Sequence, residues 1–202
     1  MQPSHHTNFL FVGGEDLNMF CGHFWAETCG DVFSARISEF CTAIEARLLP
    51  AFDDLEGEAD QAANAEWDRL SREADPEWVD QAEVAERATE VGVAYYLSMQ
   101  SVRQALINLS IAALYHLFEQ QMLFFHRQQL LHPREENDAS LINMRELMSR
   151  LALGGVDVHK MRSWPRIQEL KAAANVVKHA EGRSADELRQ MAGLVWTPGP
   201  GS

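Results

Sequence analysis

Three polar side chains that could do chemistry stand together in a segment otherwise rich in small and aliphatic residues. Asn175, Lys178 and His179 lie in ELKAAANVVKHAEG, residues 169–182. Residues three and four positions apart are neighbours on a helix, so these side chains are expected to share one face. An imidazole exchanges protons near neutral pH, an ammonium group supplies positive charge, and an amide orients a bound group. The segment therefore predicts a site for acid or base catalysis.

A second set of polar residues follows one stripe of an apolar segment, NLSIAALYHLFEQQMLFFHRQQLL, residues 108–131. Apolar residues occur nearly all round this segment, which predicts a central helix packed on most of its sides. The stripe consists of Asn108, His116, Glu119 and Arg127. If this stripe and the polar face of residues 169–182 face each other or flank a common groove, Glu119 can balance Lys178 or orient His179. The alternative for this set is a half-exposed ion pair and a histidine that only caps helix carbonyls.

The elements that carry these residues are predicted to be helices, because the apolar period is helical almost throughout. Two helices are expected in the first part of the chain, 33–48, ended or bent by Pro50, and 51–73. A long helix follows from Asp75 and Pro76 to before Pro133, with an interruption near Gly92. Three more are expected after it: one opened by Asp138 or Ser140 and closed by Gly154 and Gly155, one opened by Ser163 and Pro165 and stopped by Gly182, and a short one opened by Ser184 and Glu187. Residues 9–12, FLFV, are the one candidate strand.

The sequence thus predicts an all-α fold, an up-and-down bundle of antiparallel helices in a single domain of residues 1–202. Acidic helices are expected in 1–100, a helical core in 101–190 and a disordered tail in 191–202. The apolar runs are far shorter than the roughly 20 residues that a membrane span needs, and the first residues lack the features of a secretory signal. We therefore expect a soluble, cytoplasmic protein without a membrane partner.

Charge divides unequally along the chain. The net charge is −13; residues 1–100 hold 20 acidic and 5 basic residues, and residues 101–202 hold 10 and 12. An acidic surface repels phosphate backbones, and here the repulsion falls mostly in the first half. The second half is left able to meet a polyanion, unless these charges are simply solvated helix faces.

Metal and cofactor sites are not expected. Cys21, Cys29 and Cys41 form no C-x-x-C pair, which is typical of free thiols in a reducing compartment. The spacing of Cys21, His23 and Cys29 matches no common zinc pattern. His116 and Glu119 reverse the order of the Glu-x-x-His motif of di-metal helical bundles, and the pair occurs once.

Residues 169–188, ELKAAANVVKHAEGRSADEL, resemble the C-terminal signature of bacterial helical proteins of the HEPN superfamily. Residues 114–121, LYHLFEQQ, are similar to the polar early helix of the same proteins. The resemblance implies a HEPN-like core for 101–190, commonly dimeric. Its active members are metal-independent endoribonucleases, and many serve in toxin–antitoxin or phage-defence systems. The resemblance also implies that Asn175 is the polar residue and His179 the histidine of the active site.

Ala174 stands where active members of the superfamily carry an arginine, the usual cation near the scissile phosphate. Either Lys178 or Lys171 substitutes for it, or the domain keeps the fold without catalysis. A second match to the spacing, Arg127 to His132, stands directly before Pro133.

Two function classes follow. In the first, a HEPN-like protein cleaves or binds RNA. In this class His179 is the acid or base, Asn175 positions the substrate and Lys178 supplies charge. Glu119, with the nearby His116, orients the catalytic side chain. In the second, a non-catalytic acidic helical protein binds a cognate protein partner. A homodimer is expected in the first class.

Overall fold

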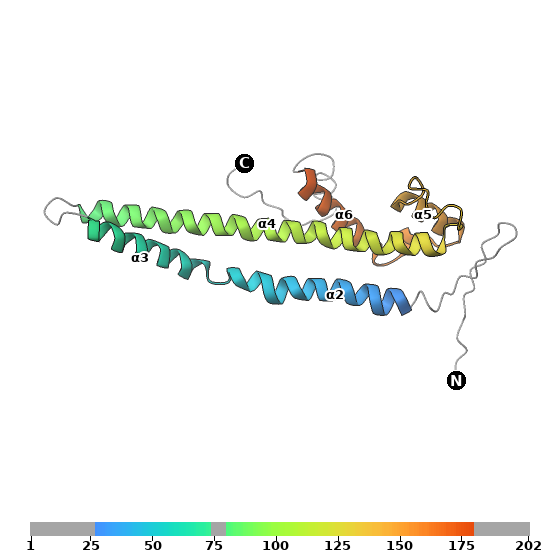
Figure 1. Ribbon diagram of the computed structural model, residues 1–202, viewed down its shortest axis with the longest axis horizontal. Helices are drawn as coiled ribbons and strands as arrows, with labels where there is room; N and C mark the ends of the chain where they lie inside the picture. The colour runs from blue at the N-terminus through green and yellow to red at the C-terminus, as the bar shows by residue number, and fades with distance from the viewer. Residues whose placement is uncertain (1–26, 74–79, 180–202) are drawn as a thin grey trace, which may run out of the picture. The chain divides into compact units, whose positions relative to one another are not determined.

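The computed structural model describes residues 27–73 and 80–179, the side chain of His179 excepted. Every regular element in these ranges is a helix, so the predicted all-α helical bundle is confirmed (Figure 1). The elements in order are η1 Thr28–Phe33, α2 Ser34–Ala43, η2 Ile44–Leu48, η3 Leu49–Phe52, α3 Leu55–Glu73, α4 Gln81–Gln129, α5 Met144–Leu153, η4 Val158–Lys160 and α6 Trp164–His179. The predictions for residues 9–12, Asp75 with Pro76, Gly182, Ser184 with Glu187, and the 191–202 tail lie outside the described ranges.

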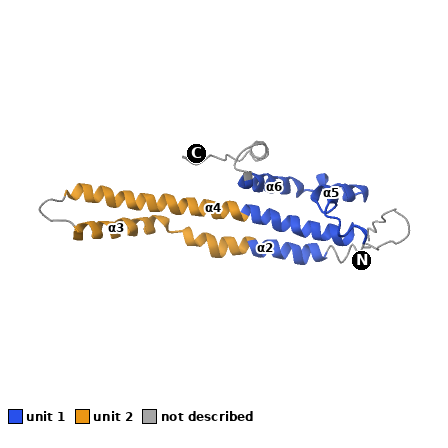
Figure 2. Cartoon of the chain, turned by 45° about the horizontal axis from the view of Figure 1, so that its top comes forward, with its two compact units in different colours: residues 1–40, 111–202 blue, residues 41–110 orange. Residues whose placement is uncertain are grey.

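The chain divides into two compact units that do not follow its linear order (Figure 2). Unit 1 comprises residues 1–40 and 111–202, and unit 2 comprises residues 41–110. Helix α4 therefore contributes residues 81–110 to unit 2 and residues 111–129 to unit 1.

The predicted end of the first helix is confirmed. A helical run of π and α turns continues from Thr28 to Leu48, and η3 then carries Pro50 in its first turn. Proline lacks the N–H that continued helical hydrogen bonding requires, so the run stops there.

In unit 2, α3 pairs with the first part of α4 through small residues. The hydroxyl of Tyr95 on α4 donates a hydrogen bond to Oε2 of Glu58 on α3, with 2.7 Å between the oxygens. Small and aliphatic side chains are buried along the pair: Leu55, Ala59, Val84 and Ala88. Alanines leave room for the two backbones to approach closely.

The predicted interruption of the long helix near Gly92 is wrong, because α4 runs unbroken from Gln81 to Gln129. A Cβ atom built on Gly92 would lie 2.9 Å from the carbonyl oxygen of Ala59 and 3.0 Å from Cβ of Ala63. The glycine therefore makes space for α3 instead of breaking α4. The helix begins after Asp80, whose Oδ1 accepts a hydrogen bond from the backbone N–H of Ala82 at 2.8 Å.

The core of unit 1 joins η1, α4 and α5. Phe33, Phe125 and Leu147 form a buried cluster, and Leu147 is 0% exposed. Partly buried apolar residues pack around it: Met122, Leu130, Met144 and Leu151. Removing a buried leucine of this kind costs about 2–5 kcal/mol, so this cluster is a main source of the unit's stability.

Helix α5 begins later than predicted. Asn143, in extended backbone conformation, accepts a hydrogen bond from the N–H of Glu146 at 2.9 Å and is the N-cap. Asp138 instead accepts hydrogen bonds from the N–H and hydroxyl of Ser140, which closes a turn before the helix. The predicted end is confirmed: Gly154 follows the last helical residue, and Gly155 has a φ of 82°, a conformation that favours glycine.

The opening of α6 is also as predicted. The carbonyl of Ser163 accepts hydrogen bonds from the N–H groups of Arg166 and Ile167, at 3.1 and 3.2 Å. Pro165 stands in the first helical turn, where a missing N–H costs nothing. Helix α6 packs against η4, the short turn that precedes it.

Candidate functional site

On α4 in unit 1, His116 is exposed and Glu119 is partly buried, as in the alternative of a half-exposed pair. Nδ1 of His116 is 3.9 Å from Oε2 of Glu119, and the two side chains keep 60% and 32% of their surface exposed. Nε2 of His116 also lies 3.0 Å from Nε2 of Gln120. Arg127, on the same stripe, is exposed. An ion pair this exposed contributes about 0–1 kcal/mol and holds neither side chain firmly.

Tyr115 is the buried neighbour of this pair. Burial and, after it, the negative charge of Glu119 raise the pKa of the Tyr115 hydroxyl. The phenol therefore stays protonated at neutral pH and is available as a hydrogen-bond donor.

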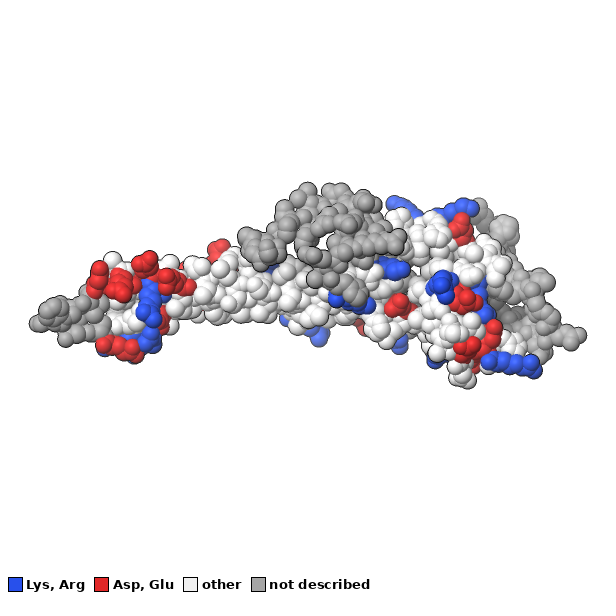
Figure 3. Space-filling model, turned by 90° about the horizontal axis from the view of Figure 1, so that it is seen from above, with Lys and Arg blue, Asp and Glu red and all other residues white. Residues whose placement is uncertain are grey.

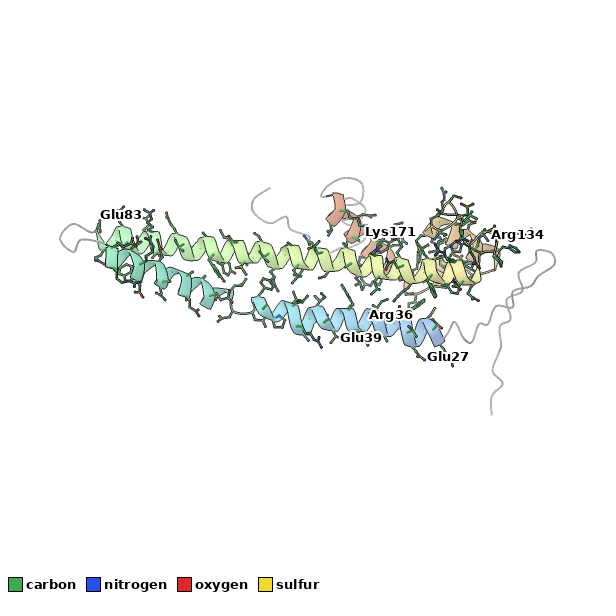
Figure 4. All side chains as sticks on the ribbon, in the orientation of Figure 1. Glu27, Arg36, Glu39, Glu83, Arg134 and Lys171 are labelled. Carbon is green, nitrogen blue, oxygen red and sulfur yellow. The ribbon has the colours of Figure 1, made fainter. Side chains whose placement is uncertain are left out.

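On α6, the predicted site residues face different surroundings. Lys178 is exposed, as is Lys171, which is labelled in Figure 4, whereas Asn175 is partly buried. Within residues 27–73 and 80–179, no hydrogen bond or ion pair joins Glu119 to Lys178. Because the side chain of His179 is not described, the grouping of the five predicted site residues stays a prediction. These residues are His116, Glu119, Asn175, Lys178 and His179.

Ala174 is fully buried. Its exposed fraction is 0%, and that of nearby Ala172 is 3%. A guanidinium group at position 174 would have no path to solvent without displacing its neighbours, and burying it unpaired is costly. An arginine at this position is therefore expected to destabilise the fold.

The sequence prediction missed two polar side chains buried in unit 1. Gln121 and His126 are 5% and 0% exposed. Nε2 of Gln121 donates to the carbonyl of Phe33 at 3.4 Å, but its Oε1 has no partner within the described part of the chain. Neither ring nitrogen of His126 has a hydrogen-bond partner there. Such groups are rare in folded proteins because each one loses its hydration without compensation.

Among charged groups, Arg150 of α5 has the largest effect on the pKa of His126. Arg150 also forms hydrogen bonds to three segments of the chain. Its guanidinium donates to both carboxylate oxygens of Glu135 at 2.9 and 3.1 Å, to Glu146 at 2.9 Å, and to the carbonyl of Leu130 at 2.8 Å. The last bond caps the end of α4 with positive charge. Arg150 and a backbone hydrogen bond from His132 lower the pKa of Glu135 to about 2.

The same cluster disfavours protonation of His126. Burial, and after it the charge of Arg150, lower the pKa of the imidazole, while Glu146 and Glu135 act weakly in the opposite sense. The ring is therefore neutral at pH 7 and is enclosed in the core. A general base must reach its substrate, so His126 is a structural histidine and not a catalytic one.

Exposed cations gather on η4 and α6. Residues 158–178 contain five Lys or Arg and one acidic residue, in a chain whose net charge is −13. The five cations are Lys160, Arg162, Arg166, Lys171 and Lys178, and all are exposed. Two of them have acidic neighbours: Lys160 lies 3.3 Å from Asp157, and Arg166 lies 2.7 Å from Glu169. This is the part of the described chain best suited to a polyanion.

Unit 2 carries a surface of another kind. Between Glu90 and Arg103, α4 has no charged residue, and this stretch shows as continuous white in Figure 3. Large apolar side chains are exposed on it and just beyond: Val93, Leu97, Val102 and Leu109. Leu109 is 65% exposed, so the segment predicted to be packed on most sides has an open side here.

The described ranges lack two features, a metal-binding cluster and a membrane-spanning helix. They hold no cluster of three or more His, Cys, Asp or Glu that could bind a metal ion. None of their helices combines the length and hydropathy that crossing a bilayer demands. Comparison with models of protein families, with curated proteins and with solved structures finds no match to this chain.

Proposed function

We propose that this chain is a HEPN-like protein that binds RNA through the exposed side of α6 and does not cleave it. The observation that carries the proposal is the row formed by Lys171, Asn175 and Lys178, at steps of four and three residues along one face of the helix. Both lysines are exposed, and neither forms an ion pair with a described residue. Such cations are free to neutralise phosphates, and the amide can donate to a phosphate or ribose oxygen.

The buried Ala174 is the reason for proposing binding without cleavage. Phosphodiester cleavage needs a cation fixed close to the scissile phosphate as negative charge develops. Lys171 and Lys178 are held by no described partner, so they supply charge without the fixed geometry that this role requires. In this proposal His179 does not act as an acid or base.

The experiment measures binding and cleavage together. Purified protein is titrated into labelled transfer RNA and into a labelled unstructured RNA at several salt concentrations. We expect the double variant Lys171→Gln/Lys178→Gln to reduce the slope of log affinity against log salt by roughly 1.4, two phosphates at about 0.7 each. Arg36→Gln, an exposed cation on α2 in the same unit (Figure 4), is the matched control and should leave the slope unchanged.

Two results would reject the proposal. If the wild-type protein binds neither RNA at low salt, the function is wrong. If it cleaves RNA and His179→Ala abolishes the cleavage, binding without catalysis is wrong and the ribonuclease prediction is correct.

A second candidate function is binding of a basic protein, and the charge of unit 2 favours it. Residues 41–110 hold 15 acidic and 5 basic residues. Acidic residues occupy the first turns of both its long helices: Glu56 and Glu58 on α3, and Glu83 on α4. In this candidate, a basic protein purified with the chain dissociates when Glu56 and Glu83 are replaced by glutamine, and the Lys171→Gln/Lys178→Gln variant keeps it bound.

A further inference from the structure

The turn between η4 and α6 brings two aromatic rings and three cations together at the surface of unit 1. The rings of His159 and Trp164 are 5.2 Å apart between centroids and meet edge to face, with 79° between their planes. The cations are Lys160, Arg162 and Arg166. Lys160 and Arg166 keep 84% and 83% of their side-chain surface exposed. We call this set the junction surface.

Local hydrogen bonds fix the backbone of the junction surface. Asp157 caps η4 by accepting from the N–H of His159 at 3.1 Å. The N–H of Trp164 donates to the carbonyl of Met161 at 3.0 Å, which sets the indole at the first position of α6. The indole is therefore presented by an ordered turn, so a base that stacks on it does not bear the cost of ordering the chain.

We infer that the junction surface binds single-stranded RNA, with a base stacked on the indole of Trp164, beside the edge-to-face ring of His159, and phosphates on the neighbouring cations. The inference rests on the proposed RNA-binding function and extends it to a second group of residues. Trp164, Lys171 and Lys178 follow each other at seven-residue steps, which places them on one side of α6. The junction surface is thus the start of a track that continues along the lysine row.

The aromatic pair is what selects a single strand. Every base has a π face, and stacking on an aromatic side chain is the common way in which proteins hold unpaired bases. In a duplex the base faces are covered by their neighbours, so only backbone contacts would remain. Charge favours a nucleic acid without choosing between strand forms, since the three cations outnumber the two nearby carboxylates, Asp157 and Glu169.

The test compares a labelled 12-nucleotide oligouridine with a labelled 12-base-pair RNA duplex by fluorescence anisotropy. The wild-type protein should bind the single strand more tightly. We expect Trp164→Ala to weaken binding of the single strand about tenfold, as loss of one stacked base does, and to change duplex binding little. Trp164→Phe keeps a ring and should recover most of the affinity. This variant also separates loss of stacking from misfolding, which circular dichroism checks independently.

The cations are tested with Arg162→Gln and Lys160→Gln combined. We expect the slope of log affinity against log salt to fall by roughly 1.4 for the single strand. If the wild type binds RNA and loses it on Lys171→Gln/Lys178→Gln, yet both junction variants bind normally, this inference is wrong and the proposed function stands. If the wild type binds no RNA, both are wrong.

Two further outcomes would overturn the inference alone. Equal affinity for the duplex and the single strand would show that no base is stacked. Binding of a polyglutamate peptide as tight as that of the oligouridine, with the same sensitivity to the junction variants, would assign the surface to an acidic protein.

Discussion

Replacing His126 by leucine is expected to stabilise the protein. The imidazole is 0% exposed, and neither nitrogen has a hydrogen-bond partner among the described residues. Leaving a buried polar group unpaired costs about 1–3 kcal/mol, whereas an apolar side chain of similar size has nothing to leave unpaired. At pH 7.5 the free energy of unfolding of His126→Leu should therefore exceed that of the wild type by about 1–3 kcal/mol.

The same substitution should remove a dependence on pH. The pKa of His126 in the folded protein lies below its ordinary value of 6.5. Below pH 6.5 the unfolded chain binds a proton that the folded chain excludes, so stability is complete above this pH and falls as the pH drops through the folded pKa. The steepest slope is about 1.4 kcal/mol per pH unit, so the wild type should lose stability between pH 6.5 and 5.5, by no more than this slope allows. The leucine variant loses nothing at this position.

Urea denaturation followed by circular dichroism at pH 7.5, 6.5 and 5.5 measures both effects. This range lies above the pH at which ordinary carboxylates titrate, so His residues dominate the change. His116→Leu, at an exposed histidine on the same helix, is the control and should leave the free energy of unfolding at pH 7.5 close to that of the wild type. A His126→Leu protein that is less stable than the wild type at pH 7.5, or equally sensitive to pH, would refute this reasoning.

Three more substitutions test the packing. Gly92→Ala should lower the free energy of unfolding by about 1–2 kcal/mol despite the higher helix propensity of alanine, because its Cβ would lie 2.9 Å from the carbonyl oxygen of Ala59. The control is Gly30→Ala, whose Cβ meets no atom within 4 Å and should not lower the free energy of unfolding. Urea denaturation compares the two variants. Glu135→Gln should remove part of the loss of stability that the wild type shows in acid. Because the pKa of Glu135 is about 2, the stability that this carboxylate gives above its ordinary pKa of 4.5 is lost as the pH falls toward 2. Acid titration followed by circular dichroism measures this loss in both proteins. Ala174→Arg should lower the thermal midpoint by at least about 5 °C and produce no RNA cleavage, since position 174 is 0% exposed; a cleaving variant with an unchanged midpoint would contradict the burial argument.

Features set by local chemistry were predictable from the sequence. Pro50, the Gly154 and Gly155 pair, and Ser163 with Pro165 each mark a helix end through the backbone of their own few residues. The start of α5 was harder, because Asp138, Ser140 and Asn143 are all good N-caps within six positions. Only the folded chain shows that the first two close a turn.

Features set by distant contacts were not predictable in the same way. Gly92 indicates a break when α4 is considered alone, and its role appears only with Ala59, which lies 33 positions earlier in the sequence. His126 did leave a signal, since it stands four positions after Met122 of α4 and four before Leu130, which follows the helix, and both of these residues pack against the core. The charge that acts on His126 comes from Arg150 of α5, and no sequence pattern near His126 predicts this interaction.

The close approach of α3 and α4 in unit 2 has a consequence for recognising related chains. Ala59 and Ala63 stand four positions apart on one helix, as do Ala88 and Gly92 on the other. Larger side chains at these positions would force the two backbones apart, whereas the outward positions between them tolerate almost any polar residue. Distant homologues should therefore keep two small-x-x-x-small motifs about 25 residues apart even where the remaining identity has been lost, a fingerprint that follows from steric volume alone.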